Sequence, residues 1–327
     1  MKRENNHGEG GHICPLFLER KNNRERPLRL LFVVIFAFSV VGLLGYGIFY
    51  LWQNESSRNT QKELQDIRKE ADTSVQYDEN GLPVAGIAAF FADLYNDIPT
   101  EKEWNKTPDI LPKYKELYEI NPDLIGWLTI DGTVIDYPVM QTMEDECYYL
   151  QLDFYGEPNQ NGSLILDTDS TSGTGTNVCD YKNGTKPSTN LIIHGHTMKS
   201  GAMFGNLKLY ADEEYGREHN IICYDSLYEE REYELISVFY SQVYYKSDNV
   251  FKYYKFFQAD TQEEFDDWYE NIKAMSLYDT GVTAQFGDEF LTLSCCSYHV
   301  EDGRFVVVGK RTKYSCINIQ GKLQYNR

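Results

Sequence analysis

The stretch Leu291-Thr292-Leu293-Ser294-Cys295-Cys296, followed by Gly303-Arg304-Phe305-Val306-Val307-Val308-Gly309-Lys310, decides how this chain folds. Both segments are rich in residues that favour strands, and a short polar segment separates them, so they predict two paired strands. The first strand ends in a thiol, and the second carries a guanidinium near its start. Pairing of the two strands would hold a cation within reach of a cysteine side chain.

Alternation along the first strand separates its two cysteines. Consecutive side chains of a strand point to opposite faces, so Thr292, Ser294 and Cys296 share one face and Cys295 lies on the other. We therefore expect Cys296, not Cys295, to be the reactive thiol. Ser294 is a candidate to hydrogen-bond a substrate, or else it satisfies the strand end. The alternative for both cysteines is burial in a sheet core, the commoner fate of an isolated cysteine.

A cysteine nucleophile also needs an acid or base, and the segment Ile193–Lys199 (IHGHTMK) offers His194 and His196. A cation such as Arg304 suits the oxyanion that forms when a thiolate attacks an amide carbonyl, although an arginine there could also be a plain surface residue. None of the seven cysteines forms a CxxC pair, so we expect no structural zinc site. Neither a metal nor an organic cofactor is implied.

Three blocks, TLSCC, HGHTMKSGAMF and GRFVVVGK, resemble the signature blocks of sortases, the cysteine transpeptidases of Gram-positive cell surfaces. The similarity extends through NPDLIGWLTIDGTVIDYPVMQ (Asn121 to Gln141) and YYLQLDFYGEPNQNGSLILD (Tyr148 to Asp167), in the family's order, from near Asp109 to Thr312. The chain departs from the family pattern TLxTC at one position, where Cys295 stands in place of threonine.

The resemblance implies residue roles and a reaction. Cys296 would be the nucleophile, His196 the acid and base, and Arg304 the oxyanion cation, whereas His194 would be structural. Cys296 would cleave a sorting motif near the C-terminus of a secreted protein and form a thioester. An amine of a peptidoglycan stem peptide, or of its lipid-linked precursor, would then resolve that thioester.

The fold class that we expect is mostly β, a sortase-type closed β-barrel with N-terminal helices. Short runs of Val, Ile, Thr and Tyr separated by turn signals begin at Ile125 and suggest a barrel or a sandwich. The segment Thr261–Tyr278 has helical spacing, and Thr261 with Glu264 fits a capping box. A long helix between two late strands is a feature in which the chain resembles class B sortases. The resemblance implies that the substrate motif is Asn-Pro-x-Thr-x or a related pentapeptide. No Pro-flanked aromatic lid and no C-terminal anchor is evident, which also favours class B.

One transmembrane helix is expected before this domain. The run Leu30–Trp52 is 23 residues long and uncharged, and interfacial aromatics rather than a small-residue cleavage site end it. Residues 1–29 carry seven Lys or Arg, and the next basic residue is Arg58. The positive-inside rule then places the N-terminus in the cytoplasm and the catalytic part outside, in a single-pass membrane protein. The net charge of −19 argues against nucleic acid as a partner.

The expected organisation has five parts: a cytoplasmic tail (1–29), an anchor (30–52), an extracytoplasmic stalk with N-terminal helices (53–108), the catalytic domain (109–315) and a C-terminal tail (316–327). Within the third part, Gln61–Ala71 is predicted to be a solvated helix, and Ile87–Tyr95 a second helix. A further helix is predicted over Leu111–Glu119, because Asn121-Pro122 would end it.

Two other functions fit the same residues. In a cysteine endopeptidase of wall peptides, water instead of an amine would resolve the thioester. In a non-catalytic surface adhesin, the strands would only display loops, and the placement of a thiol opposite a cation would be coincidence.

Overall fold

The computed structural model describes residues 25–74, 109–174 and 184–312. The chain divides into two units, one that ends at Trp52 and one that begins at Gln53. The predicted helix Ile87–Tyr95, the boundary at 108/109 and the expected tail 316–327 lie outside the described residues.

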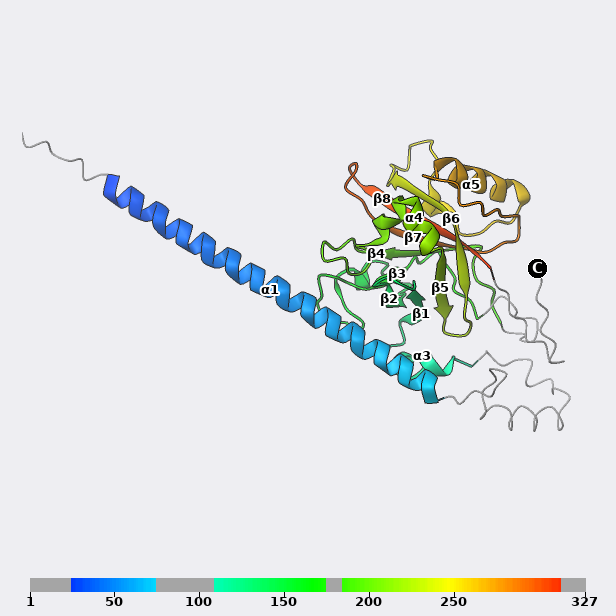
Figure 1. Ribbon diagram of the computed structural model, residues 1–327, viewed down its shortest axis with the longest axis horizontal. Helices are drawn as coiled ribbons and strands as arrows, with labels where there is room; N and C mark the ends of the chain where they lie inside the picture. The colour runs from blue at the N-terminus through cyan, green and yellow to red at the C-terminus, as the bar shows by residue number, and fades with distance from the viewer. Residues whose placement is uncertain (1–24, 75–108, 175–183, 313–327) are drawn as a thin grey trace, which may run out of the picture. The chain divides into compact units, whose positions relative to one another are not determined.

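The second unit is built on eight strands that close into a ring (Figure 1). Around the ring the order is β1-β2-β3-β4-β7-β8-β6-β5, and β5 pairs with β1 to close it. The β2–β3 and β4–β7 pairs are parallel, and the remaining pairs are antiparallel. The strands are β1 (Leu124–Thr129), β2 (Asp136–Met140), β3 (Leu164–Leu166), β4 (Asn190–Gly195), β5 (Ile221–Ser226), β6 (Glu232–Gln242), β7 (Phe290–Cys296) and β8 (Gly303–Arg311).

Helices accompany this ring, so the fold is mixed α/β instead of mostly β as predicted. Helix α1 (Glu25–Ser74) has 50 residues, whereas the longest strand, β6, has 11. The shorter helices are α3 (Pro112–Ile120), α4 (Glu213–Glu218) and α5 (Gln262–Met275), with one-turn 3₁₀ helices η2 (Tyr148–Gln151), η4 (Leu207–Ala211) and η5 (Tyr253–Lys255). The mostly-β expectation failed because it counted strand signals and gave the N-terminal helices too little length.

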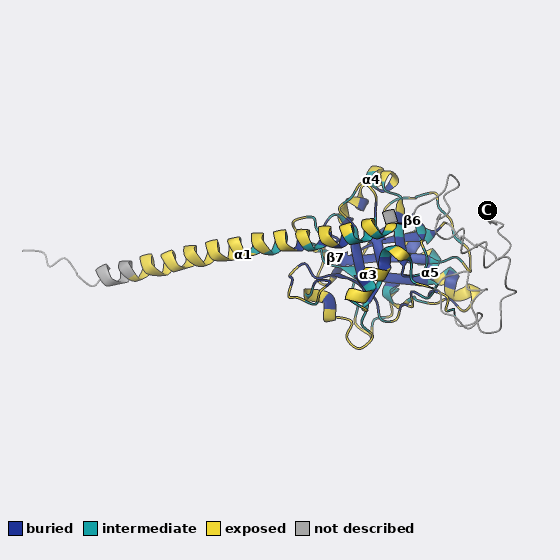
Figure 2. Ribbon diagram, turned by 90° about the horizontal axis from the view of Figure 1, so that it is seen from below, coloured by how far each residue is buried: buried dark blue, intermediate teal, exposed yellow. Residues whose placement is uncertain are grey.

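Alternation along β7 separates two hydrophobic cores. Leu291, Leu293 and Cys295 belong to the core inside the ring, whereas Phe290 belongs to a second core outside it. Figure 2 shows the strands largely in the dark blue of buried residues. The two faces of β7 are therefore both covered over most of its length, and only its last residue, Cys296, is exposed.

Helix α5 forms the second core with the outer faces of β6, β7 and β8. Its capping box is present as predicted, with the Thr261 hydroxyl accepting from the Glu264 backbone N–H. The helix buries Phe265, Trp268 and Ile272, and Trp268 stacks on Phe256 at a ring separation of 4.4 Å. This helix supports the strands that carry the site and contributes no reactive group to it.

The part of α1 beyond Gln53 packs on the ring, which corrects the prediction of a solvated helix over Gln61–Ala71. Leu64 is fully buried in a cluster with Trp127. Arg68 lies over the Trp127 ring at 4.6 Å and forms an ion pair with Asp136 at 3.0 Å. The segment is helical as predicted, but one of its faces is buried.

The preceding part of α1 is apolar and exposed. Leu31–Asp72 contains a stretch that is long and apolar enough to cross a membrane, by length and composition alone. Figure 2 shows the described residues of this part, 31–52, almost entirely in the yellow of exposed residues. Membrane anchors and signal sequences share these properties.

Candidate active site

Three neighbouring strands bring the predicted catalytic residues to one end of the ring. Cys296 is the last residue of β7 and pairs with Arg304 on β8. On the other side of β7, Gly195 of β4 pairs with Cys295, and His196 follows at the next position. Because paired residues point to the same face of a sheet, this register aligns the side chains of His196, Cys296 and Arg304.

The two adjacent cysteines have different surroundings. Cys296 is exposed, whereas Cys295 is 3% exposed and belongs to the core inside the ring. Burial raises the pKa of the Cys295 thiol to about 11. Cys295 is therefore neutral near pH 7 and inaccessible, so it behaves as a small apolar residue.

His196 is oriented by a backbone carbonyl. Its Nε2 donates to the Leu150 carbonyl oxygen at 2.7 Å, because a carbonyl can only accept. Leu150 lies in η2, far from His196 in the sequence. With Nε2 protonated and engaged, Nδ1 is the nitrogen that is available to exchange a proton with a substrate.

Gly162 lies close to both the His196 imidazole and the Leu150 carbonyl that orients it. Its φ is +60°, and a Cβ there would lie 2.3 Å from the Leu150 carbonyl oxygen and 3.1 Å from Cδ2 of His196. Any larger residue would therefore displace the carbonyl that orients His196. Sequence analysis missed both Leu150 and Gly162, although Asn161-Gly162 was visible as a turn signal.

Thr197 connects the histidine segment to the end of β7. Its hydroxyl donates to the Cys296 carbonyl oxygen at 2.6 Å, and it pairs with Met203 in an isolated bridge. The Phe204 backbone N–H donates to the His196 carbonyl oxygen at 2.9 Å. These bonds fix the backbone on both sides of the thiol and the imidazole. Thr197 was also missed by sequence analysis, since threonine after histidine carries no distinctive signal.

Arg304 is half-buried, and its guanidinium forms hydrogen bonds with the turn that precedes it. Its Nη1 donates to the carbonyl oxygens of Asp302, at 3.3 Å, and Gly303, at 3.0 Å. Within the described ranges, no carboxylate forms an ion pair with this guanidinium. The positive charge beside Cys296 is therefore not neutralised by a paired acid.

Ser294 lies on the same strand face as Cys296, but another element covers it. It is 1% exposed, and its hydroxyl is 2.7 Å from the hydroxyl of Tyr253 in η5. Burial raises the pKa of Tyr253, which keeps that phenol protonated. The observed contact fits the alternative in which Ser294 satisfies the strand end, because no accessible group remains for a substrate.

His194 faces a different group of side chains. Its Nε2 lies 3.1 Å from Oδ2 of Asp167, and ligand atoms of Glu146, Asp167 and His194 all lie within 4.8 Å of one another. Burial and the nearby Asp167 carboxylate raise the pKa of Glu146. Three such groups could hold a cation by distance alone, but His194 and Asp167 already satisfy each other, so we assign no ion here.

Comparison with known proteins identifies the family. No protein-family model matches the chain. Sortase B of Listeria monocytogenes is 31% identical over 209 residues, which cover 63% of this chain and 76% of that protein. The chain therefore belongs to the sortase B family and is a cysteine transpeptidase. This confirms the class B resemblance that the sequence motifs indicated.

Solved structures agree with this assignment. The crystal structure of sortase B from Bacillus anthracis in complex with AAEK1 matches with a TM-score of 0.57 and 27% identity, covering 81% of this chain and all of that one. A crystal structure of sortase B complexed with triglycine matches with a TM-score of 0.60 and 22% identity, covering 80% of this chain and all of that one. At 22% identity, the match to the triglycine complex shows a similarity of fold.

The close packing of Gly162 against His196 leads to the first prediction. Gly162→Ala should lower kcat about 10- to 100-fold with little change in KM, because small displacements of a catalytic group are costly. Steady-state kinetics on a sorting peptide would measure this. Gly156→Ala is the matched control: its φ of +78° imposes similar strain, but nothing lies within 4 Å of the added Cβ. Equal losses in both variants would show that strain alone is responsible.

The two cysteines should also differ in reactivity. Iodoacetamide at neutral pH should label Cys296 in the folded protein, whereas Cys295 should react only after unfolding, because it is buried and protonated. Tandem mass spectrometry of the peptide that contains both residues would locate the label. The exposed Cys147 provides an internal standard for reagent access. Labelling of Cys295 at the same rate as Cys296 would contradict its assignment as a packing residue.

Proposed function

We propose that this sortase B homologue cleaves a C-terminal sorting motif of secreted proteins and joins the new carboxyl end to a cell-wall amine. The observation that carries the proposal is the exposed Cys296 at the end of β7, with His196 just after the end of β4 and Arg304 at the paired position of β8. Family membership decides against the adhesin alternative, since the sortase B family is one of transpeptidases.

In the proposed first step, the Cys296 sulfur attacks the scissile carbonyl carbon and the C–N bond breaks. Nδ1 of His196 takes the proton of the Cys296 thiol and passes it to the departing amine, while Nε2 stays on the Leu150 carbonyl. Before the C–N bond breaks, Arg304 donates to the oxyanion of the tetrahedral intermediate, which requires its guanidinium to exchange a turn carbonyl for the substrate oxygen. The product of this step is a thioester on Cys296.

In the proposed second step, an amine attacks the thioester carbon. The new C–N bond forms, the C–S bond breaks, and the proton of the amine goes to Nδ1 of His196. The existence of a sortase B complex with triglycine supports a glycine amine as the acceptor, as at the end of a peptidoglycan stem peptide or its lipid-linked precursor.

We further propose that the apolar stretch of α1 is an uncleaved anchor at about residues 30–52. Seven basic residues precede it, and the positive-inside rule then leaves the catalytic unit outside the cell. The proposed parts are a tail (1–29), the anchor, a membrane-proximal segment (53–108), the catalytic domain (109–315) and a second tail (316–327).

The decisive test adds an amine to the reaction. The full chain in detergent micelles is given a peptide that contains an Asn-Pro-x-Thr-x motif, with and without triglycine. Mass spectrometry should find the amide-linked product and faster turnover when triglycine is present, because aminolysis of the thioester replaces slower hydrolysis. Cys296→Ala should be inactive, whereas Cys295→Thr, the matched change at the neighbouring position, should remain active. A chain that only hydrolyses, whatever amine is offered, is the endopeptidase.

The role of Arg304 has its own test. Arg304→Ala should lower kcat about 10²- to 10³-fold, the usual cost of losing an oxyanion donor, and should change KM much less. Arg304→Lys should rescue poorly, because the ammonium lacks the planar fork of the guanidinium. Pre-steady-state measurement of thioester formation would locate the loss in the first step. A loss confined to KM would assign Arg304 to substrate binding instead.

A further inference from the structure

A pocket lies near the histidine side of the proposed site. It has a volume of about 410 Å³ and lies between α1, from Asn54 to Gln65, and the loop Ser200–Met203. Asn161 and Tyr137 form further parts of its wall. Every residue that lines it belongs to the second unit of the chain.

Three largely buried polar side chains line this pocket, and one of them has a buried oxygen without a partner among the described residues. Ser57 is 5% exposed, Gln61 is 8% exposed and Asn161 is 3% exposed. The Gln61 Oε1 is buried and accepts no hydrogen bond from the part of the chain that the structure describes. The described residues also provide no hydrogen bond to the side chains of Ser57 and Asn161. Buried polar groups are nearly always satisfied, so the open Gln61 Oε1 indicates a ligand that offers a hydrogen-bond donor.

The pocket is connected to His196 through two short stretches of chain. Asn161 precedes Gly162, where an added Cβ would lie 3.1 Å from Cδ2 of His196. The loop Ser200–Met203 comes shortly after His196, and the Thr197–Met203 bridge holds its end. Both stretches end next to His196, so the pocket and the imidazole belong to neighbouring parts of the structure.

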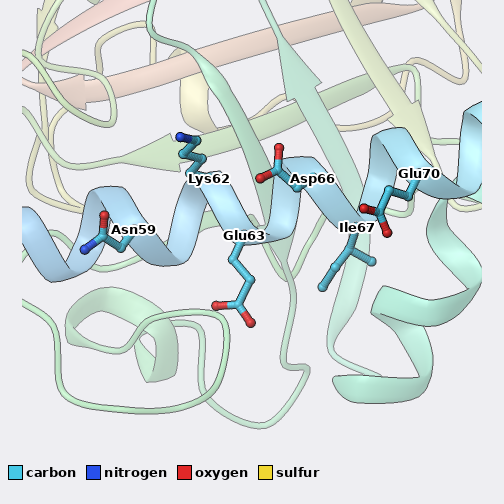
Figure 3. A pocket seen from close by; sticks show the side chains of 6 residues that line it. All are labelled: Asn59, Lys62, Glu63, Asp66, Ile67 and Glu70. Atoms are coloured by element: carbon cyan, nitrogen blue, oxygen red, sulfur yellow. The ribbon is translucent and has the colours of Figure 1, made fainter.

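The mouth of the pocket is cationic although the chain as a whole has a net charge of −19. Arg58 and Lys62 line it, and its lining contains no Asp or Glu. Figure 3 shows Lys62 and Asp66 projecting from one side of α1, whereas Glu63 points to the other side. Asp66 lines only a neighbouring hollow, and Glu55 is 3.7 Å from Arg58 with both side chains largely exposed. Such a mouth favours an anionic group.

We propose that this pocket binds the acceptor of the second step, a short peptide that carries a free amine and a carboxylate. Peptide N–H groups donate to Gln61 Oε1, the carboxylate faces Arg58 and Lys62, and the amine extends toward His196. The assignment rests on the proposed function, because only a transpeptidase needs a second substrate. Peptide backbone donors match the unpaired amide oxygen, and a carboxylate matches the two cations.

The first test measures how each enzyme divides its thioester between triglycine and water. Gln61→Leu removes the acceptor oxygen at similar size, so the triglycine concentration that gives equal amide and acid should rise about five- to tenfold, the cost of one hydrogen bond. Ser57→Ala should raise it less. Lys69→Ala, an exposed residue of the same helix outside the pocket, is the matched control and should change nothing. If the triglycine concentration that gives equal amide and acid is unchanged in Gln61→Leu, the pocket holds only water, and the proposal is overturned.

A second experiment changes the charge of the acceptor peptide. Triglycine amide, which lacks the carboxylate, should be a poorer acceptor than triglycine for the wild-type enzyme. In the Arg58→Ala, Lys62→Ala double variant the two acceptors should perform equally. If the preference for triglycine persists in that variant, the carboxylate is bound elsewhere.

A direct measurement of binding tests the pocket independently of the proposed transpeptidation. Triglycine is titrated by NMR into the full chain carrying Cys296→Ala, with and without Gln61→Leu. Weaker binding in the double variant supports the pocket even if the wild-type enzyme transfers to no amine, a result that would overturn the transpeptidation proposal alone. Equal binding by both proteins overturns the pocket assignment even if transfer is observed.

Discussion

The pairing of β7 with β4 on one side and β8 on the other is the constraint on which the rest of the site depends. Side chains alternate along a strand, so a shift of one residue in β7 would turn Cys296 inward and Cys295 outward. The two cores prevent that shift. Leu291, Leu293 and Cys295 fill the ring interior, while Phe290 contacts Trp268 of α5 from the opposite face. Closure of the ring adds to this, because every strand has partners on both sides.

Local sequence signals predicted a large part of this arrangement. The β7 and β8 strands, their alternation and the capping box of α5 all follow from short-range patterns, and the structure contains each of them. The register of Cys296 with Arg304 follows as well, since two strands joined by a short turn pair almost inevitably. These features were predictable because their partners lie close in the sequence.

Contacts between distant segments could not be predicted in the same way. The Leu150 carbonyl that orients His196 lies 46 residues away, and a backbone oxygen has no sequence signal. Strand alternation placed Ser294 on the face of Cys296 but could not reveal that Tyr253 covers it. The apolar positions of α1 beyond Gln53 looked too sparse for a buried face. Leu64 is nevertheless buried, because the surface that receives it comes from distant strands and from α3.

The engagement of Nε2 by Leu150 also constrains the order of the proposed reaction. With one imidazole nitrogen occupied, Nδ1 must give a proton to the departing amine and later take one from the entering amine. The ring then alternates between its charged form and a single neutral tautomer, and it never needs to rotate. Both amines must use the same position beside Nδ1, so the first product has to leave before the acceptor amine can enter. A fixed histidine of this kind therefore favours a ping-pong sequence, in which the thioester persists until the second substrate arrives.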